Sequence, residues 1–208
     1  MLLSFEEINS VLQSKNIQVN GALHIGAHEC EELYFYIKLG IYKNIVWVDA
    51  VKEKVLEAKA KGFPIYEAII SDKDDQDVSF NISNNGQSSS LLEFGTHSKE
   101  HPHVVYVDKI KGKSITVDTF FERYGLNAQK YDFWNFDIQG AELMALKGAT
   151  KSIQHAKALY MEVNEKELYK GCGLIKEMDA FLSQHNFKRV LTSMTKYGWG
   201  DALYILEK

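Results

Sequence analysis

The segment ALHIGAHECEELYFY at residues 22–36, followed by IVWVDA at 45–50, decides the fold. An apolar run leads into the small residues Gly26 and Ala27, which predicts a strand that enters a tight turn. A helical pattern follows, and the next apolar run ends in Asp49. A strand, a small-residue turn, a helix and a second strand that ends in an acid are typical of nucleotide-like cofactor sites in parallel α/β sheets.

The turn itself indicates which cofactor to expect. Small side chains there are expected to let backbone N–H groups approach a ligand closely. Asp49 lies 23 positions after Gly26 (49 − 26), near the roughly 20 positions at which an acid bonds ribose hydroxyls. Cys30 stands where a GxGxxG motif would have a glycine, which argues against a dinucleotide diphosphate. A nucleoside cofactor such as S-adenosylmethionine fits this pattern, and an ordinary βα turn with an incidental carboxylate is the alternative.

Composition limits the class of protein. The chain has 208 residues, 45% of them hydrophobic and 25% charged, which suits one domain over residues 1–208. Its net charge is −4 and its basic residues are scattered, so we expect neither a nucleic acid nor a membrane surface as partner. No apolar run approaches the roughly 20 residues of a membrane span, and residues 1–10 lack a secretory signal. Cys30 and Cys172 form no CxxC, so we expect reduced thiols in a cytoplasmic protein.

Strand and helix patterns alternate along the chain, which predicts a doubly wound, Rossmann-like α/β sheet with mainly parallel strands. Within an N-terminal segment 1–19, Ser4 and Glu7 form a capping box for a helix over residues 4–15. The expected strands span 21–25, 45–49, 65–70, 132–138 and 157–163, and the expected helices span 29–39, 51–61, 141–151 and 174–185.

The end and the middle of the chain depart from this alternation. Two final strands at 187–192 and 202–207 are joined by a loop too short for a parallel crossover, so they should pair antiparallel, as in class I methyltransferases. Residues 71–131 are rich in polar turn formers. We expect this segment, with a hairpin of 77–82 and 103–107, to be either a solvated excursion or a substrate-facing flap.

Acids stand at three expected strand ends, at Asp49, Asp137 and Glu162. Because the carboxyl ends of parallel strands meet at one edge of the sheet, these carboxylates should face one crevice. Carboxylates gathered at one site repel one another and are stabilised by a ligand or a metal ion.

Two further groups of side chains have a structural and a functional interpretation. The cluster of His97, His101 and His103 lacks the spacing of a helical metal site, so we expect loop histidines that are solvated or contact substrate. Trp199 either forms a wall of the acceptor pocket or packs at a hairpin corner. We expect a core that contains the aromatic side chains of Tyr34, Tyr36, Trp47, Phe133, Trp134 and Phe136.

Over residues 20–207 the sequence resembles the FkbM-type methyltransferase family. The resemblance rests on HIGAHEC at 24–30, WVDA at 47–50, FDIQGAELMALKGA at 136–149 and MEVN at 161–164. Members of this family depend on S-adenosylmethionine and typically methylate hydroxyl oxygens, often of sugars. The resemblance therefore implies an S-adenosylmethionine-dependent O-methyltransferase that acts on a sugar hydroxyl of a glycan or glycolipid precursor.

The resemblance also implies roles for individual residues. The methionine end would lie against the turn that contains Gly26, Asp49 would hold the ribose, and Asp137 would lie beside the transferred methyl group. Many members have an acid at the position of His24 and a glycine at that of Cys30, so a non-catalytic cofactor-binding module is the alternative. The implied cofactor-binding residues are His24, Gly26, Ala27, His28, Asp49, Ala50, Ser71, Asp72 and Asp137.

Methyl transfer from a sulfonium is an in-line displacement, so positioning should supply most of the acceleration. A hydroxyl acceptor must still lose its proton to a base, and the candidates are Asp137, Glu162 and His28, in that order. A divalent cation between Asp137 and Glu162 could instead acidify the hydroxyl, although the sequence predicts no metal site.

Overall fold

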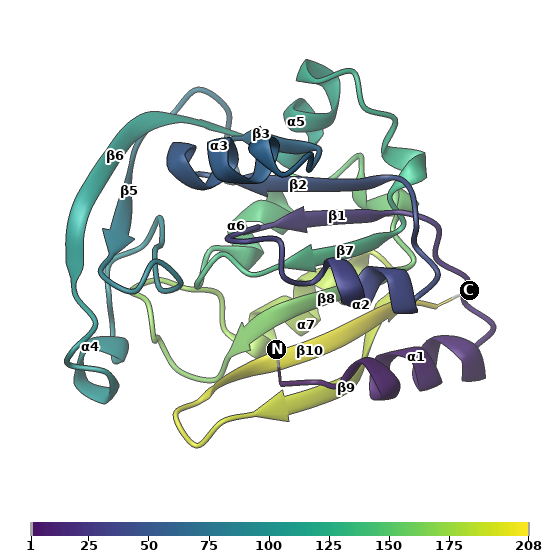
Figure 1. Cartoon of the computed structure of the whole chain (residues 1–208). Coiled ribbons are helices and arrows are strands. Elements are labelled where there is room, and N and C mark those ends of the chain that lie inside the picture. Colours follow the sequence, from purple (N-terminus) through teal and green to yellow (C-terminus); the bar gives the residue numbers. More distant parts are fainter. Residues whose placement is uncertain (1, 208) are drawn as a thin grey trace.

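The computed structural model describes residues 2–207 and contains a seven-stranded sheet in the order β3-β2-β1-β7-β8-β10-β9 (Figure 1). β1 is parallel to β2 and β7, whereas β10 is antiparallel to both β8 and β9. The predicted doubly wound, mainly parallel sheet with an antiparallel C-terminal hairpin is therefore confirmed. Its strands are β1 (Ala22–Ile25), β2 (Ile45–Asp49), β3 (Ile65–Glu67), β7 (Phe133–Phe136), β8 (Ala158–Asn164), β9 (Phe187–Met194) and β10 (Trp199–Leu206).

Helices cover both faces of this sheet. On one face are α1 (Phe5–Ser14), α2 (Leu33–Lys38) and α3 (Lys52–Ala60), and on the other are α5 (Val117–Arg123), α6 (Glu142–Lys147) and α7 (Ile175–Gln184). Each face of the sheet has its own hydrophobic core, and alternate residues of β1 pack into the two cores. Ala22 packs in the cluster that contains Tyr36, and Leu23 packs in the cluster that contains Phe120. This double burial explains why the central strands are mainly apolar.

The first helix begins where the capping box predicts. The Ser4 hydroxyl oxygen accepts from the Glu7 N–H at 3.2 Å, and the Ser4 N–H donates to the Glu7 carboxylate at 2.8 Å. Ile8 and Leu12 are buried one turn apart, and α1 packs near the β9–β10 end of the sheet (Figure 1).

The helix expected at 29–39 is shorter than predicted, because α2 begins only at Leu33. His28 and Cys30 have positive φ angles of 42° and 59°. A right-handed helix cannot include such residues. The turn after β1 therefore extends over the first residues of the expected helix.

The strand expected at 65–70 divides between two sheets. β3 continues the large sheet, and the Ala68 N–H makes the last bond to that sheet, donating to the carbonyl of Asp49 at 3.0 Å. β2 ends at Asp49, so the chain turns to another partner. β4 (Ile69–Ile70) pairs with β6 (Tyr106–Ile115) in a three-stranded sheet of order β4-β6-β5.

Residues 71–131 form a folded extension. β5 (Asp77–Ser83) pairs antiparallel with β6, and this ribbon projects beyond the edge of the large sheet (Figure 1). The predicted hairpin exists, but its second strand spans 106–115 rather than 103–107. Two shorter helices, α4 (His97–Glu100) and the 3₁₀ helix η1 (Ala128–Lys130), also lie within it. We call residues 77–115 the flap.

Helix α5 was not predicted within this polar segment. The Thr116 hydroxyl caps its start by accepting from the Thr119 N–H at 3.1 Å, and Val117, Phe120 and Phe121 are buried. The spacing of these apolar residues is helical, so tertiary burial and a side-chain cap together explain the helix. Another 3₁₀ helix, η2 (Ile153–His155), precedes β8.

Most of the expected aromatic core is buried. Tyr36, Trp47, Phe133, Trp134 and Phe136 have no exposed surface. The prediction was wrong for Tyr34, which is 66% exposed on the outer side of α2. Cys30 and Cys172 are free and buried. Over residues 2–207, no helix combines the length and apolar character needed to cross a bilayer.

Candidate active site

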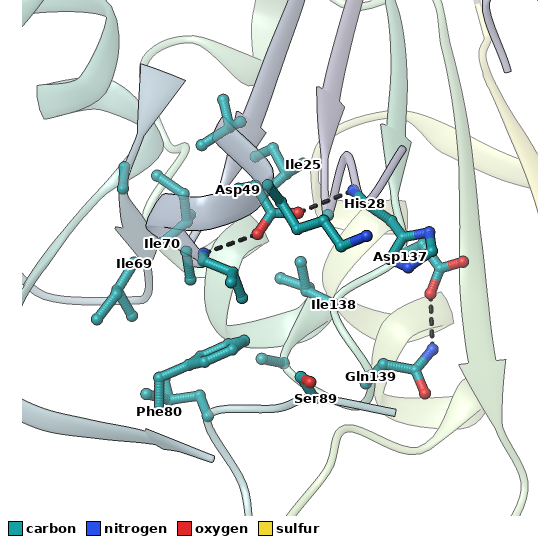
Figure 2. A pocket seen from close by; sticks show the side chains of 18 of the residues that line it. Ile25, His28, Asp49, Ile69, Ile70, Phe80, Ser89, Asp137, Ile138 and Gln139 are labelled. Atoms are coloured by element: carbon teal, nitrogen blue, oxygen red, sulfur yellow. Dashed lines mark hydrogen bonds between the residues drawn. The ribbon is translucent and has the colours of Figure 1, made fainter. Parts of the chain in front are cut away.

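Two adjoining cavities open where β1, β2 and β7 end. The first has a volume of about 190 Å³ and a mainly apolar lining (Figure 2). The second has a volume of about 480 Å³ and a more polar lining. Apolar side chains from the large sheet, β4, the flap and the turn after β7 surround the first cavity: Ile25, Val48, Ile69, Ile70, Phe80, Ile82, Leu91 and Ile138. The residues that line both cavities are Gly26, His28, Gln87, Asp137 and Gln139.

Asp49 lies at the polar side of the first cavity. One carboxylate oxygen accepts from the His28 N–H at 2.8 Å and the other from the Val51 N–H at 2.8 Å (Figure 2). Burial raises the pKa of Asp49, and these two bonds oppose the increase. Each oxygen keeps a further lone pair. The carboxylate can therefore keep its bonds to the two backbone N–H groups and also accept hydrogen bonds from the hydroxyl groups of a ligand.

The backbone amides of the turn after β1 are not free, contrary to the prediction. The N–H groups of Gly26 and Ala27 both donate to the carbonyl of Val48, at 2.9 and 3.0 Å. Gly26 has another role: its φ is +92°, and a Cβ there would lie 1.8 Å from the carbonyl oxygen of Asp137. Glycine thus allows the turns after β1 and β7 to touch, which brings Asp49 and Asp137 to the same cavity.

The predicted acids Asp137 and Glu162 come together, and a neutral side chain links them. Nε2 of Gln139 donates to Asp137 at 2.7 Å and to Glu162 at 2.9 Å. The hydroxyl of Tyr169 donates to Oε1 of the same amide at 2.5 Å. Of the three strand-end acids, Asp137 and Glu162 therefore line the second cavity, while Asp49 lines only the first.

The second cavity is strongly acidic. Its lining includes no lysine or arginine from the described chain, residues 2–207. Burial and then the neighbouring carboxylates raise the pKa of Glu162 well above its usual value. Burial likewise raises the pKa of Glu32 to about 7. We call its five carboxyl groups the acidic wall, which consists of Glu31, Glu32, Asp137, Glu162 and Asp201.

Histidine and aromatic side chains also line the second cavity. His97, His101 and His103 all line it, together with Tyr169 and Trp199. Burial lowers the pKa of His97 to about 4, so this imidazole is neutral. Trp199 lines this cavity and also packs against the buried cluster of Leu168, Tyr169 and Cys172. Over residues 2–207, no group of three or more histidine, cysteine or acidic side chains is arranged to hold a metal ion.

Comparison with known proteins identifies the family. The profile of the methyltransferase FkbM domain matches residues 22–189. The chain belongs to the FkbM methyltransferase family. The resemblance indicated by the four sequence motifs is thereby confirmed, and the protein is an S-adenosylmethionine-dependent methyltransferase.

Two solved structures share the fold of this FkbM methyltransferase. The methyltransferase domain of bacterial CtHen1-C is 11% identical, with a TM-score of 0.50 over 98% of this chain and 97% of that chain. A Streptococcus pneumoniae protein named as a tRNA (m1A22) methyltransferase, in complex with S-adenosyl-L-methionine, is 12% identical, with a TM-score of 0.50 over 97% and 71%. At these identities the likeness concerns the fold alone. No curated protein matches the sequence.

Four of the residues implied as cofactor contacts lie outside the lining of both cavities of the methyltransferase: His24, Ala27, Ser71 and Asp72. His24 is 1% exposed, its ring stacks on Trp47 with centroids 4.7 Å apart, and its Nδ1 lies 2.8 Å from the Tyr36 hydroxyl. Burial lowers its pKa to about 3, so it is a neutral core side chain. Ala27 is also buried, and the Ser71 hydroxyl donates to Asp72 at 3.2 Å.

Several lining residues had no role in the sequence analysis, and Lys54, Phe80, Ile82 and Gln139 are among them. Phe80 and Ile82 alternate with polar residues in the strand DVSFNIS, a signal that one face of the flap is covered. Gln139 stands inside the motif FDIQGAE, but its partner Glu162 is 23 residues away and the motif does not reveal the contact.

Proposed function

We propose that this enzyme transfers the methyl group of S-adenosylmethionine to a hydroxyl oxygen of a sugar, in a glycan or glycolipid precursor. The observation that supports this acceptor is the composition of the second cavity, which combines the acidic wall with the rings of Tyr169 and Trp199. Carboxyl oxygens accept hydrogen bonds in either protonation state, so five carboxyl groups at one cavity favour a ligand rich in hydroxyl donors. Aromatic faces suit the apolar side of a sugar ring.

The two cavities fit the two ends of the cofactor. An adenine suits the apolar first cavity, where Asp49 is available for ribose hydroxyls, and the positively charged end suits the acidic wall. We propose Gly26, His28, Asp49, Ala50 and Asp137 as contacts. His24, Ala27, Ser71 and Asp72 are left out because they line neither cavity.

We propose Asp137 as the general base. It lines both cavities, and its Oδ2 has no hydrogen-bond partner among residues 2–207. As the acceptor oxygen forms its bond to the methyl carbon and the carbon–sulfur bond breaks, the hydroxyl proton passes to this oxygen. Both oxygens of Glu162 accept hydrogen bonds, from Gln139 at 2.9 Å and from Asn164 at 3.4 Å, and the His28 ring lies 3.0 Å from the Glu31 carboxylate, so Glu162 and His28 are second choices.

We also propose that the acceptor is not a nucleic acid. Phosphates close to the acidic wall would be repelled, and the lining supplies no lysine or arginine within residues 2–207 to neutralise them. A cytoplasmic location stays a prediction from the sequence.

A transfer assay tests this proposal. The enzyme is incubated with methyl-labelled S-adenosylmethionine and a panel of neutral saccharides, lipid-linked saccharides and RNA. We expect label on a sugar oxygen, located by mass spectrometry and NMR, and a loss of about 10²–10⁴-fold for Asp137→Asn. Label on RNA or on nitrogen would contradict the acceptor, and cofactor binding without any transfer would favour the non-catalytic module.

A further inference from the structure

Gln139 occupies the junction between the two cavities and lines both. Its backbone has a φ of +55°, which is uncommon for a residue other than glycine. Its carbonyl oxygen accepts from the hydroxyl of Ser90 in the flap at 2.7 Å. The flap and the turn after β7 therefore hold this residue in a conformation that it would rarely adopt alone.

The hydrogen bonds of the Gln139 side chain fix its orientation. Nε2 donates to the carboxylates of Asp137 and Glu162, and Oε1 accepts from the Tyr169 hydroxyl. A rotated amide would place its oxygen against two carboxylates, which cannot donate when ionised. With the two acids ionised, the network therefore favours the orientation in which the amide N–H groups face them.

The amide also separates two groups that repel each other. Asp137 and Glu162 both lie within hydrogen-bond distance of one nitrogen, and burial and nearby carboxylates raise the pKa of both. A hydrogen bond to a carboxylate favours its charged form. The other titratable groups at this site are Glu31, Glu32, Glu142, Asp201, Tyr169, His28, His97, His101 and His103. Within residues 2–207, none of the residues that line the second cavity is a lysine or arginine, and Lys54 lines the first cavity.

We propose that Gln139 is a positioning residue for methyl transfer: its side-chain amide anchors one oxygen of Asp137, turns the other toward the acceptor hydroxyl and keeps that carboxylate ionised beside Glu162. This inference rests on the proposed role of Asp137 as the base. It assigns to the glutamine of the FDIQGAE segment an electrostatic task that a glutamate there would not perform, because a carboxylate has no N–H to share.

The test compares Gln139→Glu with Gln87→Glu. Gln87 also lines both cavities, so its replacement adds the same charge to the site without removing a bond to either acid. Carboxyl resonances of Asp137 and Glu162 are followed by ¹³C NMR over a pH titration of the full-length protein with S-adenosylhomocysteine. We expect the midpoint of Asp137 to rise by about one pH unit or more in Gln139→Glu, a tenfold change in proton affinity, and by less than half of that in Gln87→Glu.

Two results would overturn the inference: an unchanged midpoint of Asp137 in Gln139→Glu, or an equal rise in both variants. The NMR titration needs no acceptor, so its result is independent of the sugar assignment. Where transfer is measured, the rate profile of Gln139→Glu should move to higher pH, with the KM for the cofactor within about threefold of the wild-type value. Full turnover in Asp137→Asn would instead remove the base assignment on which the inference rests.

Discussion

The carboxylate of Asp49, at the end of β2, accepts a hydrogen bond from the backbone N–H of His28, in the turn after β1, at 2.8 Å. This bond joins the first two parallel strands at the rim of the first cavity. The same carboxylate is the proposed ribose contact, so it serves both the turn and the ligand.

Replacing Asp49 should therefore weaken cofactor binding. Asp49→Ala removes a charged acceptor whose hydrogen bonds contribute about 1.5–3 kcal/mol, so we expect binding of S-adenosylhomocysteine to weaken by about 10–100-fold. The measurement is isothermal titration calorimetry. Asp72→Ala is the control, because Asp72 lines neither cavity. Equal losses in the two variants would show that Asp49 is not a specific contact.

Replacing His24 should lower the stability of the fold and leave cofactor affinity nearly unchanged. Its ring is buried between Trp47 and Tyr36, so His24→Ala should lower the free energy of unfolding by about 2–4 kcal/mol through a cavity and the loss of one of the two hydrogen bonds of the Tyr36 hydroxyl. Affinity for S-adenosylhomocysteine should stay within about threefold, measured on the folded protein. A large loss of affinity with unchanged urea denaturation would restore His24 as a cofactor contact.

The flap should contribute to cofactor binding through Phe80. The side chain of Phe80 lines the first cavity from β5, and an aromatic contact of this kind contributes about 0.5–1.5 kcal/mol. Phe80→Ala should therefore weaken S-adenosylhomocysteine binding by about threefold to tenfold. Val107→Ala, at a 61% exposed position on the same ribbon, is the matched control. If both variants bind as the wild type does, the flap is not part of the cofactor site.

The contribution of Glu142 to the free energy of unfolding should fall as the pH rises from about 4.5 to about 8. Burial raises the pKa of Glu142 from 4.5 to about 8, so over this range the folded state holds a proton that the unfolded state releases. Glu142→Gln should flatten this part of the curve, because its side-chain oxygen can still accept from the Ile138 N–H, as Glu142 does at 2.9 Å. Urea denaturation at several pH values measures the free energy of unfolding of both proteins. If Glu142→Gln leaves its dependence on pH unchanged, the raised pKa of Glu142 is contradicted.

Much of the fold could be predicted because its central strands are buried on both faces and most of its turns are short. The split of residues 65–70 could not, because no glycine or proline interrupts IYEAII and the change of partner depends on β6, about forty residues later. The long turn before α2 depends on positive φ angles at His28 and Cys30, which carry no glycine signal.

Part of the candidate site could also be predicted from the sequence. Strand-end position was enough to find Asp49, Asp137 and Glu162, since sheet topology dictates where strand ends meet. The sequence could not show that the N–H groups of Gly26 and Ala27 are already hydrogen-bonded, because their partner is the carbonyl of Val48 on another strand. The role of Gln139 depends on contacts with β8 and with Tyr169, which only the folded chain brings together.

A crystal structure with S-adenosylhomocysteine tests the central claim most directly. We predict adenine between the flap and the sheet in the first cavity, ribose hydroxyls within 2.5–3.2 Å of the Asp49 carboxylate, and the sulfur directed toward Asp137 and the second cavity. Density for the ligand outside the first cavity, or a ribose that does not contact Asp49, would contradict the account.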